Sequence, residues 1–241
     1  GQLSYLKVKR PDMVLGVCGC MAKHLVDRVF DRAPFVDLIL GPDSYRKLPE
    51  MVAELTSEPA LDLRLDRKEH YQDIDPLRRE GTNAWVTIIR GCDKFCTFCI
   101  VPYVRGRERS LIAEEVVRQV EIAASEGFQE VTLLGQTVNS YFDGHHDFSD
   151  LLRMVASVDG IRRIRFTSPH PADFSEKLIE TMAHGDKICN SVHLPVQSGS
   201  DQVLENMGRT YTSEKYLNLV DRLRESMPGL CLSTDVIVGF P

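Results

Sequence analysis

The chain has 241 residues, of which 43% are hydrophobic and 27% are charged, and its formal net charge is −6. This balance is typical of a globular protein with one large domain, or one domain plus part of another. No apolar run approaches the ~20 residues that a membrane helix needs, and the polar, lysine-rich start does not look like a signal peptide. The seven cysteines are odd in number and unevenly placed, which argues against a secreted disulfide framework and favours metal-bound thiolates in the cytoplasm.

Residues 1–60 are predicted to form a small α/β domain that lacks its beginning. Short apolar runs predict strands, and apolar residues at helical spacing predict helices between them. The predicted elements are a strand over 13–17, a helix over 23–30, a strand over 36–41 and a helix capped by Asp43 or Ser44. Residues 61–81 are charged and have little apolar periodicity, so we interpret them as a linker between domains.

From residue 82 to residue 241, apolar strand-like runs alternate regularly with helical patterns. Strands are predicted over 84–89, 130–134, 161–167, 191–194 and 231–238. Helices are predicted over 113–125, 150–158, 174–183, 201–207 and 213–227. Such repeats indicate a parallel sheet with right-handed crossovers. In sheets of this kind, chemistry gathers at the carboxyl ends of the strands.

Three cysteines stand on one loop directly after the first strand of this alternating region. Cys92, Cys96 and Cys99 are spaced Cys-x3-Cys-x2-Cys. The loop is rich in glycine and charge, so these are not ordinary core cysteines. Three thiolates on a short loop can hold three irons of a cubane iron–sulfur cluster and leave the fourth iron for another ligand. A structural zinc site is the alternative, but it usually takes four ligands, and no partner Cys-x2-Cys pair lies nearby.

Long motifs around these cysteines and at the later strand ends resemble the radical S-adenosylmethionine (SAM) methylthiotransferase family, closest to its MiaB type. The matching segments are residues 91–103, 105–110, 133–136, 165–171, 193–200 and 233–241. The resemblance implies an α/β fold, namely a partial (β/α)6 radical SAM barrel preceded by a truncated small α/β domain. Departures from the family pattern are Thr137 for the usual Asn, Val104 for Thr and Leu111 for Arg.

The resemblance also implies the cofactors. Cys92, Cys96 and Cys99 would hold a [4Fe–4S] cluster whose unique iron is chelated by the amino and carboxylate groups of SAM. The cluster would pass one electron into SAM, and the resulting 5′-deoxyadenosyl radical would take hydrogen from the substrate. The candidate SAM-binding residues are Phe98, near the adenine, and the strand-end residues Gly135, Gln136, Thr167, Ser168 and Gln197. We expect the lone histidines His170 and His193 to orient strand-end loops.

A second [4Fe–4S] cluster is implied on the small domain. Family members hold it with three cysteines, the last in a Gly-Cys-Met-Ala motif that here contains Cys20. The other two ligands are absent, so we expect a fragment without the start of this domain and without a C-terminal RNA-binding module. From the residues alone, Cys18 and Cys20 are more typical of core cysteines than of ligands. Cys189 and Cys231 are expected to be single cysteines in apolar surroundings.

The implied activity is addition of a methylthio group to C2 of N6-dimethylallyladenosine at position 37 of tRNA, with SAM as radical source and methyl donor. Arg105, Arg107 and Arg109 are candidates for contacts with tRNA phosphates. A second basic run, at residues 162–165, is either another such patch or a solvated face paired with acids. The expected partners of a monomeric, cytoplasmic protein without a membrane anchor are tRNA and a one-electron reductant such as flavodoxin or ferredoxin.

Two other functions remain open on the sequence. One is a methylthiotransferase for threonylcarbamoyl-adenosine in tRNA or for an aspartate of a ribosomal protein. The other, of a different class, is a non-catalytic metal-binding RNA-binding module that holds zinc or an iron–sulfur cluster.

Overall fold

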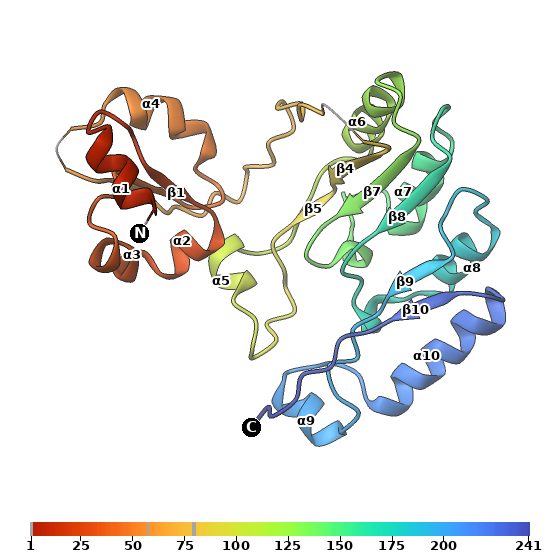
Figure 1. Cartoon of the computed structure of the whole chain (residues 1–241). Helices are drawn as coiled ribbons and strands as arrows, with labels where there is room; N and C mark the ends of the chain where they lie inside the picture. Colours follow the sequence, from red (N-terminus) through yellow and green to blue (C-terminus); the bar gives the residue numbers. More distant parts are fainter. Residues whose placement is uncertain (1, 57, 79–80) are drawn as a thin grey trace. The chain divides into compact units, whose positions relative to one another are not determined.

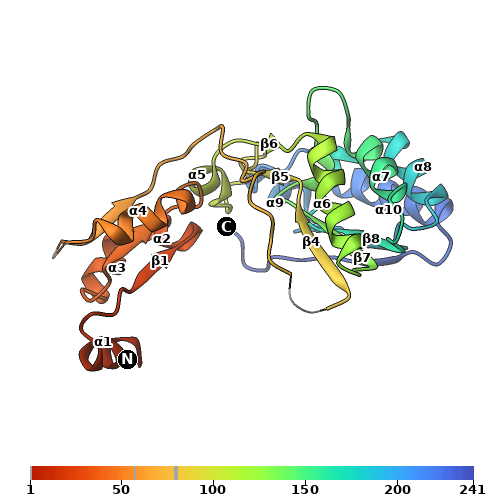
Figure 2. The same cartoon turned by 90° about the horizontal axis from the view of Figure 1, so that it is seen from above.

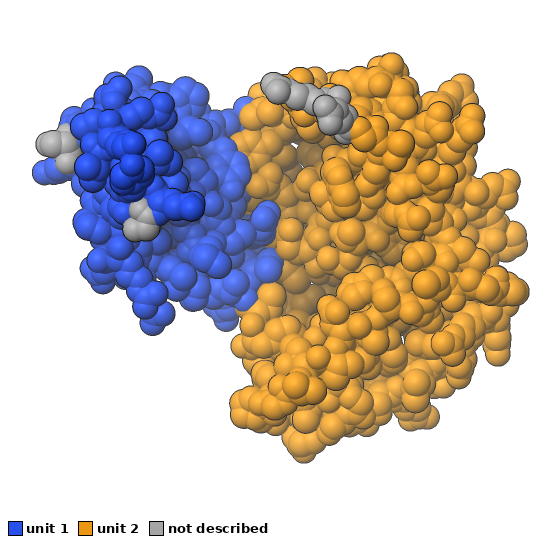
Figure 3. Space-filling view, in the orientation of Figure 1, with its two compact units in different colours: residues 1–69, 100–106 blue, residues 70–99, 107–241 orange. Residues whose placement is uncertain are grey.

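The computed structural model describes residues 2–56, 58–78 and 81–241, and the chain divides into two compact units (Figure 1, Figure 3). Unit 1 is Gly1–Glu69 with Ile100–Gly106, and unit 2 is His70–Cys99 with Arg107–Pro241. Gly1, Ser57, Arg79 and Glu80 lie outside the described residues. They fall within the predicted small domain and linker, of which only the remaining residues can be compared with the structure.

Unit 1 is built on a three-stranded parallel sheet of β1 (Gly16–Cys18), β2 (Leu38–Leu40) and β3 (Ala60–Asp62), in that order. The central strand β2 is fully buried because it has a strand on each side. A small apolar core forms around Leu15, Ala22, Val36 and Ile39. The helices are α1 (Gln2–Lys9), α2 (Cys20–His24), α3 (Val26–Arg32), the 3-10 turn η1 (Tyr45–Lys47), α4 (Leu48–Ala53) and α5 (Val101–Arg105).

Local details of unit 1 differ from the predictions. β3 crosses the predicted boundary between the small domain and the linker, because Ala60–Asp62 pairs in parallel with β2. The predicted helix over 23–30 is interrupted at Leu25, which ends α2 and begins α3. Ser44 is the N-cap residue of η1, as one of the two predicted alternatives, but its side chain makes no cap hydrogen bond. The Ser44 hydroxyl donates instead to Asp62 at 2.8 Å, and the Asp43 carboxylate accepts from the Asp66 amide at 3.2 Å. These two contacts join residues that are distant in sequence.

Unit 2 has the predicted parallel strands. β4 (Asn83–Thr87), β7 (Glu130–Leu134) and β8 (Arg163–Phe166) form one parallel sheet in that order. β9 (Ser191–His193) and β10 (Cys231–Ser233) form a second parallel pair. A parallel bridge between Ile164 and Ile188 links β8 to the approach of β9. The mixed α/β fold with the parallel strands of a partial barrel is thus confirmed.

Helices cover one face of this parallel array, as Figures 1 and 2 show. They are α6 (Ala113–Ser125), α7 (Phe148–Ala156), α8 (Glu176–His184) and α10 (Ser213–Ser226). The short helix α9 (Asp201–Asn206) lies in the connection after β9, and the 3-10 turns η2 (Val138–Ser140) and η3 (Pro171–Asp173) follow β7 and β8. α6 packs on β4 and α7, α7 packs on α8, and α8 packs on α10. The core between strands and helices includes Val86, Leu133, Leu152, Ile164 and Leu223, each fully buried. Among the described residues, no helix has the length and apolarity that crossing a membrane requires.

Two strand predictions in unit 2 needed correction. The first strand stops at Thr87, and Ile89–Arg90 forms a separate strand, β5, antiparallel to β6 (Arg109–Ser110). The last strand ends at Ser233 rather than 238. After it, the chain continues in a single parallel bridge between Gln197 and Val236. Both changes concern the carboxyl ends of predicted strands, where the backbone leaves the partner strand of the parallel sheet and pairs with another segment.

Candidate functional site

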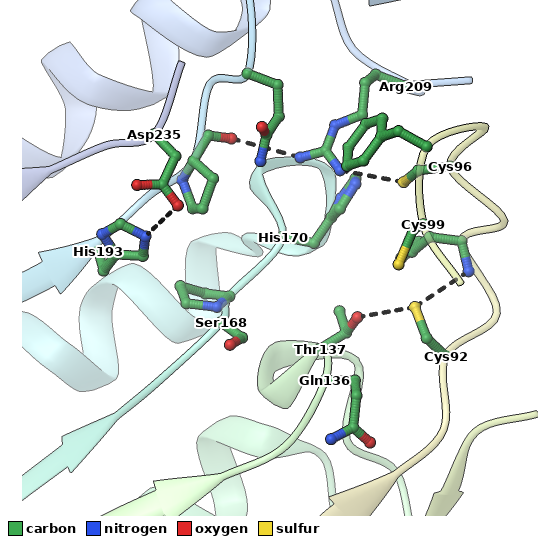
Figure 4. Close-up of a pocket in the computed structure, with 15 residues that line it drawn as sticks. Cys92, Cys96, Cys99, Gln136, Thr137, Ser168, His170, His193, Arg209 and Asp235 are labelled. Atoms are coloured by element: carbon green, nitrogen blue, oxygen red, sulfur yellow. Dashed lines mark hydrogen bonds and ion pairs between the residues drawn. The ribbon is translucent and has the colours of Figure 1, made fainter. Parts of the chain in front are cut away.

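A cavity of about 200 Å³ opens at the carboxyl ends of the strands of unit 2 (Figure 4). Residues from the loops after β5, β7, β8, β9 and β10 line it, as the barrel topology predicts. All three motif cysteines contribute to the lining. The other lining residues are Lys94, Phe98, Gln136, Thr137, Ser168, Pro169, His170, His193, Pro195, Gln197, Arg209 and Asp235.

The cysteine loop is held in place by the end of α9. The Thr97 amide donates to the Met207 carbonyl at 3.0 Å, and the Thr97 hydroxyl donates to the Asn206 carbonyl at 2.9 Å. Gly208 follows with φ +70°, and a Cβ there would lie 3.6 Å from the Phe95 carbonyl oxygen. This left-handed turn favours glycine. The loop itself turns at Phe95, whose φ is +48°. These contacts fix the loop that carries the three thiols.

Hydrogen-bond donors contact two of the three cysteine sulfurs (Figure 4). The Cys92 Sγ lies 3.3 Å from the Thr137 hydroxyl and accepts from the Lys94 amide at 3.4 Å. The Cys96 Sγ accepts from Nη1 of Arg209 at 3.2 Å. Burial, the largest effect, raises the pKa of the Cys92 thiol, whereas its hydrogen bonds oppose that shift. Donors aimed at sulfur stabilise a thiolate, which is the form that binds metal.

The residues present fit a cubane cluster. Each thiolate of such a cluster binds a different iron, and the three cysteines that line the cavity offer three such ligands. N–H and O–H groups lie against two of the three sulfurs, where they stabilise thiolates.

Four of the six residues predicted to bind SAM line the same cavity, namely Phe98, Gln136, Ser168 and Gln197. Gln136 also accepts from the Gly91 amide at 2.7 Å, which fixes the start of the cysteine loop. Ser168 and Gln197 have φ of +54° and +67°. Non-glycine residues in this region carry backbone strain, which is found most often at functional sites.

The remaining two, Gly135 and Thr167, are not among the lining residues. A Cβ on Gly135 would lie 2.2 Å from Cγ2 of Ile89, so the structure gives this glycine a packing role beneath the cavity.

His170 orients a strand-end loop, as expected. It is buried, its amide donates to the Asn139 side chain at 2.7 Å, and its ring accepts from the Ala172 amide at 3.3 Å. Burial, together with the nearby positive charges of Arg209 and Lys94, lowers the pKa of His170 to about 3. The imidazole is therefore neutral at physiological pH and serves as an acceptor within the wall of the cavity.

Sequence reasoning missed several charged groups of the cavity. The Lys94 ammonium pairs with Asp173 at 2.7 Å. Asp235 lies 3.2 Å from Nε2 of His193, whose Nδ1 lies 2.9 Å from the Ser233 hydroxyl. Asp235 could have been found by the strand-end rule, but the predicted strand ran too far and hid it. Arg209 carries no sequence signal, because it enters the site from the turn after α9.

The three candidate RNA-binding arginines have different surroundings. In unit 1, Nε of Arg105 donates to the Cys20 Sγ at 3.1 Å. In unit 2, Arg107 pairs with Asp93 at 2.8 Å and lies over the Phe95 ring at 5.1 Å, and Arg109 belongs to β6. In the second basic run, Arg163 and Arg165 pair with Glu130 at 2.6 and 3.0 Å, which favours the solvated-face interpretation of these two.

The cysteines outside the motif are not core residues, contrary to expectation. Cys20 is half-buried at the start of α2, and Cys18 is exposed. Cys189 is half-buried, and Cys231 is exposed on β10. Cys18 lies on β1 and Cys231 on β10, and both side chains are exposed to solvent. The apolar residues beside them in the sequence did not reveal this exposure.

Comparison with known proteins gives a consistent result. The family model described as the radical SAM superfamily matches residues 86–241. The chain is 44% identical over 249 residues to the tRNA-2-methylthio-N(6)-dimethylallyladenosine synthase of Bacillus subtilis (strain 168), covering 100% of this chain and 49% of that protein. The synthase of Caldicellulosiruptor saccharolyticus is 46% identical over 248 residues, covering 100% of this chain and 53% of that protein. The chain spans about half the length of the curated relatives that it matches.

Solved structures support the fold. The cobalamin-dependent SAM radical enzyme OxsB, with aqua-cobalamin and SAM bound, matches with a TM-score of 0.69 and 15% identity, over 98% of this chain and 38% of that one. The radical SAM methyltransferase TsrM from Kitasatospora setae, with cobalamin and a [4Fe-4S] cluster bound, matches with a TM-score of 0.54 and 21% identity, over 65% of this chain and 31% of that one. At such identities only the fold is shared. The match to the family model, which covers more than half of the residues, shows that this chain belongs to the radical SAM superfamily.

Proposed function

We propose that the protein is a tRNA methylthiotransferase that adds a methylthio group to C2 of N6-dimethylallyladenosine at position 37. One observation carries the proposal: the chain is 44% identical over its whole length to a synthase of that name. The cavity supports it, because the three cysteines of the Cys-x3-Cys-x2-Cys motif line one wall and polar strand-end residues line the rest. Adenine C2–H is unreactive toward protein side chains, so a bound cofactor has to supply the chemistry.

In this proposal Cys92, Cys96 and Cys99 hold a [4Fe–4S] cluster, and SAM binds beside it. When bound, the pair supplies one-electron cleavage of SAM and hydrogen abstraction from the substrate. The chain positions the reactants: Gln136 fixes the start of the cysteine loop through the Gly91 amide, and Ser168 and Gln197 offer polar groups to SAM.

Phe98 has a half-exposed ring at the cavity, edge-on to Phe240 at 6.2 Å, and we assign it to the adenine of SAM. Gly135 and Thr167 directly follow β7 and β8, and we assign them to the support of the SAM site rather than to its surface.

We assign Cys20 to a second [4Fe–4S] cluster. Its sulfur accepts from Arg105 at 3.1 Å, and a guanidinium donor favours the thiolate form that binds iron. We therefore assign Arg105 to this cysteine rather than to a phosphate.

Arg107 and Arg109 remain our candidates for tRNA contacts. Arg107 is more than half exposed, so exchanging its surface ion pair with Asp93 for a phosphate costs little. We further propose that the protein acts as a cytoplasmic monomer with a one-electron reductant such as flavodoxin or ferredoxin.

The test uses the full-length protein, reconstituted anaerobically with iron and sulfide and incubated with SAM, a reductant and tRNA that carries N6-dimethylallyladenosine. Mass spectrometry of the digested tRNA should show the 2-methylthio nucleoside, and 5′-deoxyadenosine should form. Cys96→Ala should abolish both products. Cys231→Ala is the matched control, because this cysteine is exposed and is not among the cavity residues, and it should retain both.

Two results would replace the proposal. Product formed only on threonylcarbamoyl-adenosine tRNA, or only on a ribosomal-protein aspartate, would assign the chain to another methylthiotransferase. Bound zinc without acid-labile sulfide, together with no 5′-deoxyadenosine, would indicate a non-catalytic metal-binding module.

A further inference from the structure

The cysteine loop receives side-chain donors at two of its three sulfurs. The Thr137 hydroxyl lies 3.3 Å from the Cys92 Sγ, and Nη1 of Arg209 lies 3.2 Å from the Cys96 Sγ. Within the part of the chain that the structure describes, no side-chain donor contacts the Cys99 Sγ. Neither donor belongs to the loop itself: Thr137 precedes η2, and Arg209 follows α9. The two contacts therefore depend on how the strand-end loops come together.

Arg209 is held in its orientation by several contacts. Its Nε donates to the Tyr211 hydroxyl at 3.0 Å, and that hydroxyl donates to the Val196 carbonyl at 3.0 Å. Nη2 reaches the Pro195 carbonyl at 3.4 Å, and the guanidinium lies 5.1 Å from the centre of the Tyr211 ring. A guanidinium with this many partners loses little conformational freedom when it donates to the sulfur.

Thr137 is fixed by burial. It is 2% exposed, and its carbonyl accepts from the Ser140 hydroxyl at 2.8 Å. A cysteine bound to iron is a thiolate without a proton, so in the contact with Cys92 the threonine hydroxyl must be the donor. Both contacts would then be donors that point at negatively charged ligand sulfurs.

Such donors have a definite electrochemical effect. Adding an electron to a cluster increases the negative charge on its sulfurs, so a donor stabilises the reduced state more than the oxidised state. The charge of a guanidinium adds to this effect in a site of low polarity.

We propose that Arg209 and Thr137 are positioning residues that raise the reduction potential of the cluster bound by Cys92, Cys96 and Cys99. The inference rests on the proposed function, because it requires that these cysteines hold a redox-active cluster. It goes further by assigning the potential to two side chains outside the cysteine motif.

The experiment is a redox titration followed by electron paramagnetic resonance of the reduced cluster. It uses the reconstituted full-length protein in a Cys20→Ala background, so that the signal comes from one cluster. Thr137→Val removes the hydroxyl at nearly constant size, and Thr137→Ser keeps it. Arg209→Met removes both donor and charge, and Arg209→Gln keeps a donor without the charge. Iron, sulfide and the spectral change on SAM addition are measured for each variant.

We expect Thr137→Val and Arg209→Met each to lower the ratio of reduced to oxidised cluster at a fixed potential about tenfold, which corresponds to ~59 mV for one electron. The reduction potential of Thr137→Ser should match that of the parent protein. The potential of Arg209→Gln should lie between those of the parent and Arg209→Met. If Thr137→Val or Arg209→Met does not retain the cluster, the reduction potential of the conservative variant at the same position decides the assignment of that residue. The assignment is overturned if Arg209→Gln has the reduction potential of the parent protein, or if the potential of Thr137→Ser lies well below that of the parent.

The outcomes separate this inference from the proposed function. If all variants retain the full cluster and have the same reduction potential as the parent protein, the inference is overturned. If the same preparation still methylthiolates tRNA, the proposed function stays in place. Loss of SAM binding in Arg209→Met at an unchanged potential would assign Arg209 to the cofactor instead. A parent protein that binds no iron refutes both.

Discussion

Replacement of Gly135 by alanine tests how closely the strand ends pack beneath the cavity. Gly135 directly follows β7 and precedes Gln136 and Thr137, both of which contact the cysteine loop. An alanine Cβ would lie 2.2 Å from Cγ2 of Ile89 and 3.2 Å from the Ile89 carbonyl oxygen. The backbone of Gly135 does not have a positive φ, so the cost arises from overpacking rather than from backbone strain.

The expected loss of stability is about 2 kcal/mol, within the range measured for added methyl groups in well-packed cores. With a urea m-value of about 2.5 kcal/mol per molar for a unit of this size, the unfolding midpoint should fall by about 0.8 M. The assay is urea unfolding followed by tryptophan fluorescence. Trp85, the one tryptophan of the chain, lies on β4 of unit 2 and reports on the unit that carries the mutation.

The matched control is Gly199→Ala. Gly199 also lies in a strand-end loop, but a Cβ there meets nothing within 4 Å, so its midpoint should stay close to that of the parent. Equal midpoints for the two variants would refute the packing argument and would leave Gly135 free to contact a ligand instead.

Further predictions concern a buried carboxylate and a helix cap. Burial, the largest single effect, favours the protonated form of Asp143, but backbone N–H groups, including that of Ala113, hold its pKa well below the usual value. Its stabilisation is therefore present above the unfolded pKa of about 4 and is lost as the pH falls further. At pH 7, Asp143→Asn should unfold at a lower urea concentration than the parent protein. The difference between the two unfolding midpoints should become smaller below pH 4. A difference that does not depend on pH would contradict this reasoning. Ser175 caps α8 by accepting from the Leu178 amide at 3.1 Å. Ser175→Ala should cost about 1 kcal/mol in urea unfolding, whereas Ser175→Thr should cost clearly less, and equal losses would argue against the cap.

The apolar periodicity of the sequence predicted the bounds of those helices and strands that are stabilised mainly by their own residues and by one broad apolar face. The helix predicted over 113–125 is observed with those bounds, and the strand over 130–134 is likewise observed as predicted. The spacing of the three cysteines also placed them on one loop at the carboxyl end of the parallel strands, and all three line the cavity. These features depend on periodicity and order along the chain, which the sequence states directly.

Other features depended on residues that are far apart in the sequence. β3 exists because β2 offers it a free edge, and β5 leaves the parallel sheet because Arg109–Ser110 pairs with it. Arg209 reaches Cys96 from 113 positions away, through a turn that has no motif of its own. Asp235 entered the cavity because β10 ended early.

The sequence by itself thus determined the fold class, the cysteine loop and the family. The tertiary structure alone decided which polar side chains face the sulfurs, because those contacts arise where separate strand ends meet, and no local pattern encodes the distance between them.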